Sequence, residues 1–518
     1  MLCVGHLRLE SPLFETSAKT LQLPDLAGEW REQVDAEVAR IVSASRLPVS
    51  PEAIEQIHTT LLGIAVEPLT PLRVVEYELR KFTARSRRVL GSCDQKAIVS
   101  HPSHSEWLAS LARLRLTACA ANLAKALSRV GRHLPSLPIA RPKDARAISG
   151  VQILGSETHN SGQQPVLVHL SGNQAVVYKP VSLHIDHCVA TALKGLERRS
   201  RLEGMFATLA YAPVGQDYGF LSYAAPRAQL DSESAAGRFF FRFGALIALA
   251  YALNITDMHM ENVLAVGEHP ILIDLETAIY RFPDEIRPTD ICTTGLLERG
   301  EAADNHHSGL QGGGNCTEWA LDVQRLDSGM RVGYRRAAYR ASNRATDVRG
   351  NLIDPMRYSR HVLNGFEIGY RAAEAQRRWL LEHIEASRSS ARVRHIARFT
   401  TYYALHAFRL LQPGALPMET RKEELLGALS DPGPMSPSHH LQLAAPEAND
   451  LLRGDVPYFW SDLDSRDLAN RHGVVMSGFF SSSPLEDLRE HIERLSPRDR
   501  DAQANILREV FKPGRRRR

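Results

Sequence analysis

Three short polar motifs in a fixed order constrain the fold of this chain more strongly than its composition does. Lys179 ends a β-rich run, Asp257 and Asn262 share the segment T-D-M-H-M-E-N, and Asp274 follows the apolar run I-L-I. Taken alone, a strand lysine is usually a surface residue and an Asp-x-His segment is usually a cap or a turn. In this order and spacing they indicate one α+β fold that brings distant polar side chains together.

Hydrophobic periodicity places these motifs on predicted elements. Apolar β-branched runs joined by Gly-containing turns predict hairpins at residues 165–179 and 263–275. Helices are predicted over residues 185–201 and 235–253. The second helix is apolar nearly all round, so we expect it to be buried. Lys179 should therefore end a strand, and Asp274 should follow a hairpin.

The dominant period changes near residue 146, which predicts a domain limit. Residues 1–145 show helical spacing broken by prolines and predict a mainly helical N-terminal region. Residues 146–510 predict an α+β core with a small β-rich lobe over 150–230 and a larger, helical lobe over 231–510. Residues 511–518 form a basic tail that we expect to be solvated.

Composition excludes several classes of protein. The net charge of +4 is spread along 518 residues, so no nucleic-acid partner is expected. None of the six cysteines stands in a C-x-x-C pair, which suits a reducing compartment. The longest apolar stretch, about 244–255, is too short to span a bilayer, and the N-terminus has no signal-peptide pattern. We therefore expect a cytoplasmic protein without a membrane span.

The residue types in the three motifs fit phosphoryl transfer from ATP. That chemistry needs a lysine for the phosphates, an aspartate beside the acceptor hydroxyl, and an Asn and a second Asp that hold Mg²⁺. Lys179, Asp257, Asn262 and Asp274 supply these groups in that order. The order D-x-H-x-x-N is closer to lipid kinases than to the H-R-D order of protein kinases. The sequence thus predicts a kinase-like, bilobal fold that uses ATP and Mg²⁺, with Asn262 and Asp274 as the magnesium ligands.

Further motifs make the chain recognisable. It resembles the dehydratase domain of class II lanthipeptide synthetases, the LanM type, through most of residues 150–510. The matching motifs are V-V-Y-K-P, T-D-M-H-M-E-N, P-I-L-I-D-L-E-T, T-G-L-L, N-G-F-E, R-H-I-A-R-F-T-T-Y-Y and G-D-V-P-Y-F.

The resemblance implies a reaction in two steps on a ribosomal precursor peptide with a leader. ATP would phosphorylate Ser or Thr, and elimination of phosphate would leave dehydroalanine or dehydrobutyrine. The N-terminal helical region would then help to bind the leader. If a glutamate supports Lys179, Glu197 and Glu203 are the two candidates. The residues that match the phosphorylation site of the family are Lys179, Asp257, His259, Asn262, Asp274 and Glu276.

The elimination step needs other groups, because a base must remove the α-proton and cations must stabilise the departing phosphate. The family's matching positions are Glu157 and His159 in G-S-E-T-H-N and Arg394 and Thr400 in R-H-I-A-R-F-T. A guanidinium binds phosphate in a bidentate fork, so Arg394 is the expected clamp. Read without the resemblance, Arg394 and Arg398 are four residues apart and indicate a solvated helix face.

Other functions stay open at this point. One is a kinase that stops at a phosphorylated peptide, lipid or small molecule, and another is a non-catalytic peptide-binding relative. No cysteine follows Cys316, so composition excludes a thiolate-bound zinc site in the C-terminal part. We therefore expect no zinc and no thioether cyclase activity. A separate cyclase or other tailoring enzyme, a product without rings, or a truncated synthetase are all compatible with this expectation.

Overall fold

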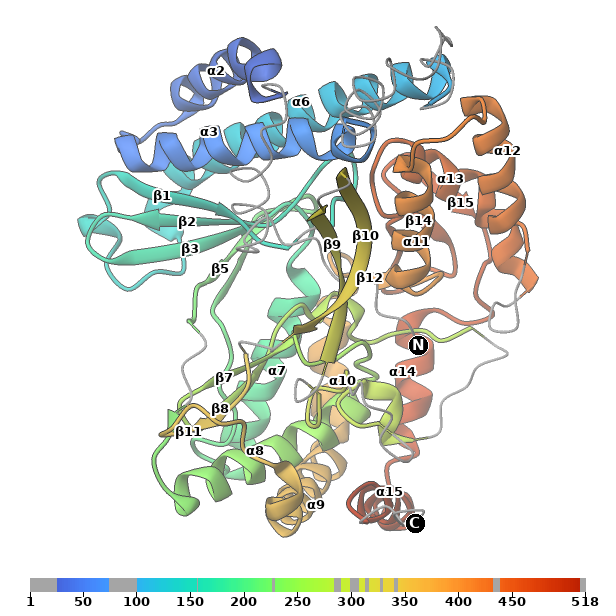
Figure 1. Ribbon diagram of the computed structural model, residues 1–518. Coiled ribbons are helices and arrows are strands. Elements are labelled where there is room, and N and C mark those ends of the chain that lie inside the picture. Colours follow the sequence, from blue (N-terminus) through green and yellow to red (C-terminus); the bar gives the residue numbers. More distant parts are fainter. Residues whose placement is uncertain are drawn as a thin grey trace, which may run out of the picture. The chain divides into compact units, whose positions relative to one another are not determined.

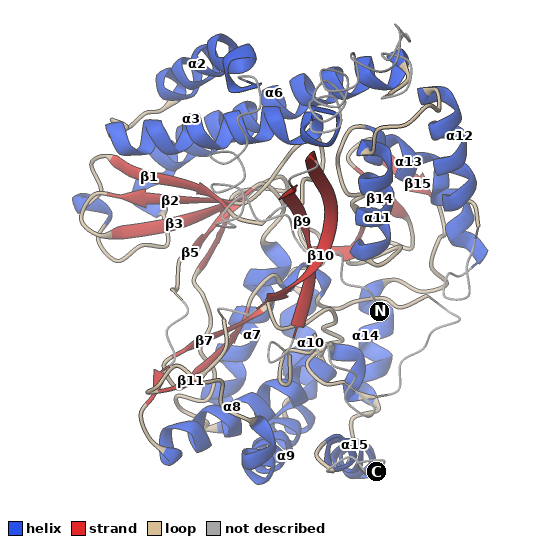
Figure 2. Ribbon diagram, in the orientation of Figure 1, coloured by secondary structure: helices blue, strands red, loops and turns tan. Residues whose placement is uncertain are grey.

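The computed structural model describes residues 26–73, 100–155, 157–225, 229–283, 290–298, 307–312, 316–326, 329–339, 343–431 and 438–512. The chain divides into two units. Unit 1 takes residues 1–180, 318–337 and 396–458, and unit 2 takes residues 181–317, 338–395 and 459–518. Both units combine helices with strands (Figure 2), which confirms the α+β class. The domain limits stay a prediction, and the four arginines of the tail lie outside the described residues.

Unit 1 contains the predicted hairpin that ends at Lys179. Strands β1 (Ile148–Ile153), β2 (Val166–Leu170) and β3 (Gln174–Lys179) pair antiparallel in that order. Gly172 and Asn173 form the turn between β2 and β3, with φ angles of 76° and 55°. Such left-handed angles are typical of hairpin turns. The hairpin prediction is confirmed, and Lys179 is the last residue of β3.

Helices pack against these strands. In Figure 1, α3 (Pro51–Val66) lies along β1, and α2 (Leu26–Ala44) and α6 (Pro102–His133) pack on α3. Residue Ser50 caps α3 by accepting the N–H of Ala53. The remaining elements that lie wholly in unit 1 are η1 (Glu67–Leu69), η2 (Leu134–Ser136), η3 (Pro142–Asp144), α11 (Thr400–Leu411), α12 (Met418–Leu429), η7 (Ser438–Leu443) and α13 (Ala444–Leu452).

The core of unit 2 is a close crossing of α8 (Glu233–Ala252) and α9 (Ser359–Ala375). A Cβ atom on Gly244 would lie 1.9 Å from the carbonyl oxygen of Val362, and one on Gly365 would lie 1.8 Å from that of Phe241. These distances leave no room for a larger residue at either of the two positions. The N-G-F-E motif, which contains Gly365, therefore has a packing role.

Helix α8 confirms the prediction of a buried apolar helix. By length and composition it could cross a membrane, but 83% of its apolar window is buried inside the protein. The core helix of a globular unit shows the same pattern. The apolar character of α8 is therefore explained by its packing in unit 2.

Unit 2 also contains further helices and strands, some of which pack on this helix pair. Strands β7 and β8 pair around Gly267 as predicted, and α7 confirms the helix expected after Lys179. The elements are α7 (His184–Ser200), β4 (Tyr211–Pro213), β5 (Gly219–Ser222), β6 (Gln229–Leu230), β7 (Val263–Val266), β8 (His269–Leu272), η4 (Leu275–Thr277), η5 (Ile291–Thr294), β11 (Thr346–Asp347), η6 (Pro355–Tyr358), α10 (Arg377–Glu385), α14 (Pro484–Glu493) and α15 (Pro497–Val510). Strands β9 (Cys316–Leu326) and β10 (Gly329–Tyr339) pair with each other.

The C-terminal part of the chain is helical only in part, which corrects the sequence prediction. Strands β12 (Arg392–His395), β13 (Phe459–Asp462), β14 (Leu468–Asn470) and β15 (Gly473–Met476) form an antiparallel sheet in that order. Strand β12 pairs with β13, which places Val393 opposite Ser461. The two strands are far apart in sequence and each has only four residues. Their pairing could not be predicted from the sequence, because no short turn joins them as in a hairpin.

Candidate functional site

The T-D-M-H-M-E-N loop in unit 2 links α8 to the hairpin of β7 and β8. The backbone N–H of His259 donates to Asp257 O, and that of Asn262 donates to His259 O, both at 2.9 Å. Asp257 has a φ angle of 62°. Aspartate is among the few residue types that adopt this left-handed conformation, which is often found at functional sites. The loop is therefore a tightly wound turn with an aspartate in a strained conformation.

The T-G-L-L motif supports this loop from one side. Met258 donates its N–H to Thr294 O at 2.9 Å. A Cβ atom on Gly295 would lie 2.8 Å from Met258 N, and Gly295 has a φ angle of 77°. Both observations require glycine at this position. The motif thus allows the two backbones to approach closely.

The hairpin that follows returns Asp274 to the same loop. Ile273 donates its N–H to Asn262 O at 2.9 Å, so one expected magnesium ligand, Asn262, is hydrogen-bonded to the residue that precedes the other, Asp274. Asp274 also has a left-handed φ angle, 57°. The next N–H, that of Leu275, donates to Oδ1 of the buried Asp186 on α7 at 3.2 Å. The loop of Asn262 and the segment of Asp274 are therefore adjacent in unit 2, and their role as magnesium ligands stays a prediction.

Groups of both charge signs act on the carboxyl group of Asp257. Part of this residue reaches solvent, but protein atoms crowd its carboxyl group, and the resulting loss of hydration raises its pKa. The negative charges of Asp274 and Glu276 raise the pKa of Asp257 further, whereas His259 and Arg394 oppose the increase. A carboxylate with a raised pKa is a stronger base than an ordinary aspartate.

The residues present fit a magnesium ion. The side-chain nitrogen of Asn262 donates to Asp257 O at 2.9 Å, so the amide oxygen is the end that would meet a cation. Together with a carboxylate oxygen of Asp274 it is the kind of ligand that Mg²⁺ prefers. Within the described ranges, no three His, Cys, Asp or Glu side chains cluster as metal ligands. Mg²⁺ at this position would thus complete its shell with phosphate oxygens and water.

Arg394 lies on β12 and donates to Oε1 of Glu276, and the two side chains are only 11% and 8% exposed. This pair joins a residue expected in elimination to one expected in phosphorylation. It also shows that the solvated helix face considered for Arg394 and Arg398 is wrong. Arg394 is on a strand, and Arg398, in the loop before α11, has a side chain that is 5% exposed.

In unit 1, the loop with Glu157 and His159 is fixed by the G-D-V-P-Y motif. His159 Nδ1 hydrogen-bonds to Val456 O at 2.8 Å, and the N–H groups of Ser161 and Gly162 donate to the Asp455 carboxylate. In the neutral ring this bond places the proton on Nδ1, so that Nε2 has the lone pair. Nε2 lies 4.0 Å from Glu157 Oε2. The imidazole is thus oriented with its basic nitrogen toward a carboxylate.

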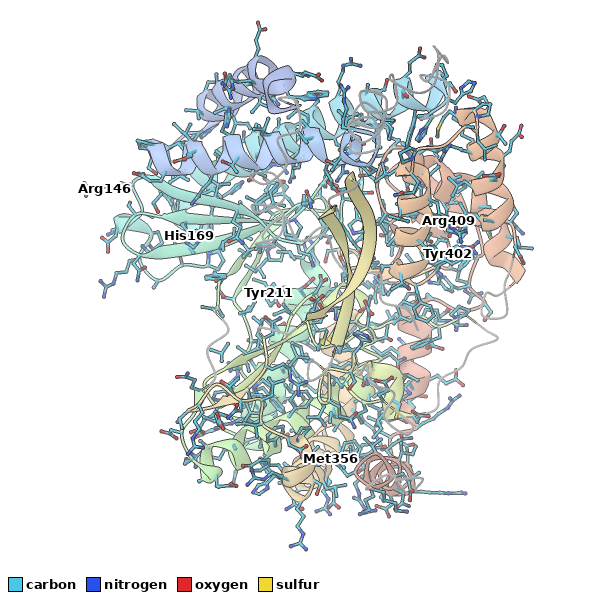
Figure 3. The ribbon with its side chains drawn as sticks, in the orientation of Figure 1. Arg146, His169, Tyr211, Met356, Tyr402 and Arg409 are labelled. Atoms are coloured by element: carbon cyan, nitrogen blue, oxygen red, sulfur yellow. The ribbon has the colours of Figure 1, made fainter. Side chains whose placement is uncertain are left out.

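Thr400 begins α11, beside a buried charge network. Arg398 Nε donates to both carboxylate oxygens of Glu447, at 2.9 and 3.0 Å, and Tyr403 donates its hydroxyl to the same group at 2.6 Å. Tyr402, labelled on α11 in Figure 3, has its ring 5.6 Å from the Arg398 guanidinium. Burial raises the pKa of Glu447, and the bonds from Arg398 and Tyr403 oppose that increase.

Glu447 was not predicted from the sequence. It is 49 positions from Arg398 and belongs to no recognised motif. Its full burial is the signal that identifies it, because a carboxylate with no exposed surface needs a partner. We assign it a role in placing the segment that contains Thr400.

Lys179 belongs to unit 1. Of the two glutamates considered as its support, Glu197 is buried in unit 2, where it accepts the Phe206 N–H at 3.3 Å and lies 3.4 Å from Lys194. Glu203 is exposed. Unit 2 brings together Asp257, His259, Asn262, Asp274, Glu276 and Arg394, and unit 1 holds Glu157, His159, Lys179 and Thr400.

Comparisons with known proteins agree with the motifs. Residues 107–462 match a family model described as "Domain of unknown function (DUF4135)", a range that contains every predicted site residue. The lacticin 481/lactococcin biosynthesis protein LcnDR2 of Lactococcus lactis subsp. lactis is 24% identical over 403 residues. The match covers 71% of this chain and 42% of that relative, so the chain spans less than half of the relative's length. The resemblance to LanM-type synthetases is confirmed.

Proposed function

The chain belongs to the DUF4135 family, and from this membership we propose that it dehydrates Ser and Thr residues of a lanthipeptide precursor. The peptide is first phosphorylated with ATP and then loses phosphate. We propose a kinase-like core for the first step and the cytoplasm, with its supply of ATP, as the location. The observation that supports this most is the hydrogen bond from the Ile273 N–H to Asn262 O, which holds the D-x-H-x-x-N loop beside the segment of Asp274.

The first step transfers a phosphoryl group to the peptide. When bound, ATP with Mg²⁺ supplies the γ-phosphoryl group and neutralises the charge on its oxygens. Asp257 accepts the proton of the Ser or Thr hydroxyl as the new P–O bond forms, and its raised pKa suits this role. Asn262 and Asp274 hold the cation, and Lys179 binds the phosphates. The bond to the leaving ADP oxygen breaks, and a phosphomonoester remains on the peptide.

The second step removes that phosphate. A base takes the Cα proton, the electron pair forms the Cα=Cβ bond, and the Cβ–O bond breaks to release inorganic phosphate. His159 is oriented as such a base by its bond to Val456 O, with Glu157 beside it. Arg394 provides the positive charge for the departing phosphate, and Thr400 contributes a hydroxyl group.

Mass spectrometry tests the proposal directly. A peptide encoded beside this gene is incubated with the protein, ATP and Mg²⁺. Dehydration removes about 18 Da per modified residue, whereas phosphorylation alone adds about 80 Da. A loss of mass that requires ATP is the expected result. A stable phosphopeptide would instead favour a kinase that stops at this product, and an unchanged peptide would favour a non-catalytic binding protein.

A further inference from the structure

A segment outside the recognised motifs holds the D-x-H-x-x-N loop from a second side. Asn343 donates its side-chain Nδ2 to the backbone oxygen of Glu261 at 2.9 Å, between Asp257 and Asn262 in the loop. The backbone oxygen of Asn343 accepts the N–H of Ala265 on β7 at 2.8 Å. Asn343 therefore bridges the end of the loop to the strand that follows it.

Arg344 extends the same support. Its guanidinium donates to two successive carbonyl oxygens, those of Gly309 at 2.9 Å and Leu310 at 2.6 Å. These two residues donate their own N–H groups to Gly295 O at 3.0 Å and to Leu296 O at 2.9 Å. One side chain thus fixes a backbone layer that pairs with the T-G-L-L motif.

This layer lies directly against the loop. A Cβ atom on Gly309 would be 2.7 Å from Met258 O, so the two backbones are in contact. Met260 donates its N–H to His307 O at 2.9 Å, and His259 and Ser308 form an isolated β-bridge. Backbone therefore encloses the loop from two sides. The Arg344 side chain connects residues 343–345 to the layer of Gly309 and Leu310.

We propose that Asn343 and Arg344 are positioning residues that keep the loop in the conformation needed for phosphoryl transfer. This inference rests on the proposed function, because it assigns the loop to that reaction. The hydrogen bonds of both side chains go to backbone carbonyl groups. They act through the backbone of Glu261 and through the layer of Gly309 and Leu310.

The loop needs such support because its backbone is strained at Asp257. A left-handed aspartate persists only where the surrounding structure fixes it. Without Arg344, the carbonyl groups of Gly309 and Leu310 lose their charged donor, and the layer against Met258 loosens. A displacement of catalytic groups by about 1 Å lowers the reaction rate about 100-fold. The loss should appear in kcat, because Asp257 lies in this loop, and KM for ATP should rise as well, because Asn262 in the same loop would hold the magnesium ion.

The experiment compares Arg344→Ala with Arg242→Ala. Arg242 is a matched control because it also donates to two backbone carbonyls in unit 2, those of Gly204 and Glu268. Hydrogen exchange of the amides of residues 257–262 is measured on the purified protein without substrate. Exchange should become at least about 10-fold faster in Arg344→Ala and stay unchanged in Arg242→Ala. Equal exchange in both variants would overturn the proposal.

Kinetics and two further variants complete the test. Arg344→Lys keeps a positive charge but reaches one carbonyl, so its kcat should lie between those of wild type and Arg344→Ala. Asn343→Ala should also lower kcat and speed exchange in the loop. If kcat is unchanged in these variants of an active protein, the positioning role is wrong and the proposed function stands. If the wild type modifies no peptide, the proposed function fails, while the exchange data still decide whether this segment fixes the loop.

Discussion

At the scale of single residues, the pair of Arg394 and Glu276 is the most informative contact. Both side chains are nearly buried. A buried charge without a partner has a large free-energy cost, so each of the two groups needs the other. The pair places the expected phosphate clamp beside the turn that contains Asp274. A phosphate group arriving there would compete with Glu276 for the same guanidinium.

Replacing Arg394 by Ala should separate the two steps of the reaction. Without the guanidinium, the departing phosphate loses its positive partner, and elimination should slow about 100-fold or more. Phosphorylated peptide should then accumulate, which mass spectrometry detects. Arg392→Ala is the matched control, because Arg392 is on the same strand and pairs with the exposed Asp462. Accumulation in both variants, or in neither, would contradict the assignment.

The second residue-scale prediction concerns the buried pair of Arg398 and Glu447. Arg398→Met removes one partner and leaves a carboxylate with no exposed surface. We expect the free energy of unfolding to fall by about 3–5 kcal/mol in chemical denaturation. Arg378→Met, which breaks an exposed pair with Glu382, should cost about 0.5 kcal/mol or less. If the free energy of unfolding falls equally in the two variants, the buried pair stabilises the protein no more than the exposed pair does.

At the scale of elements, a polar cluster fixes the last two helices to the core of unit 2. Tyr251 on α8 and Tyr370 on α9 both donate their hydroxyl groups to Asp499 on α15. His491 on α14 hydrogen-bonds through Nε2 to Tyr251 O at 2.9 Å. The helix pair at the core therefore supplies the groups that dock α14 and α15.

His491 should make this docking dependent on pH. Burial lowers the pKa of His491 below its ordinary value of 6.5, so the unfolded chain binds a proton before the folded protein does. The contribution to stability is thus present above pH 6.5 and is lost as pH falls from there toward the lowered pKa. His491→Gln can keep the bond to Tyr251 O but does not titrate. Its melting temperature should fall less than that of wild type between about pH 8 and about pH 5.5; equal falls would refute the role of His491.

At the scale of the whole molecule, each unit is assembled from three stretches of the chain, and the proposed reaction needs groups from both. Lys179 and His159 belong to unit 1, whereas Asp257, Asp274 and Arg394 belong to unit 2. A fragment of the chain that contains only one or two of a unit's three stretches would leave that unit incomplete. Both units should therefore be needed for any modification of the peptide.

Substitutions in the two units should have the same effect on the product. Lys179→Ala and Asp274→Ala should each abolish all modification, because the phosphate ligand or the magnesium ligand is lost. Lys143→Ala, an exposed lysine in unit 1, is the control and should retain activity. Circular dichroism should show that all three variants fold. Dehydrated or phosphorylated peptide from Lys179→Ala or Asp274→Ala would contradict the assigned roles.

The sequence by itself determined the local elements and the chemistry of the motifs. The hairpin at Lys179, the buried helix before Asp257 and the hairpin before Asp274 follow from short-range periodicity and turn residues, which act within a few positions of one another. Tertiary structure alone decided the pairing of β12 with β13, the contact of Arg394 with Glu276 and the burial of Glu447. Partners in these contacts are separated by 49 to 118 positions, and no local pattern encodes which distant segment a strand or a charge will meet.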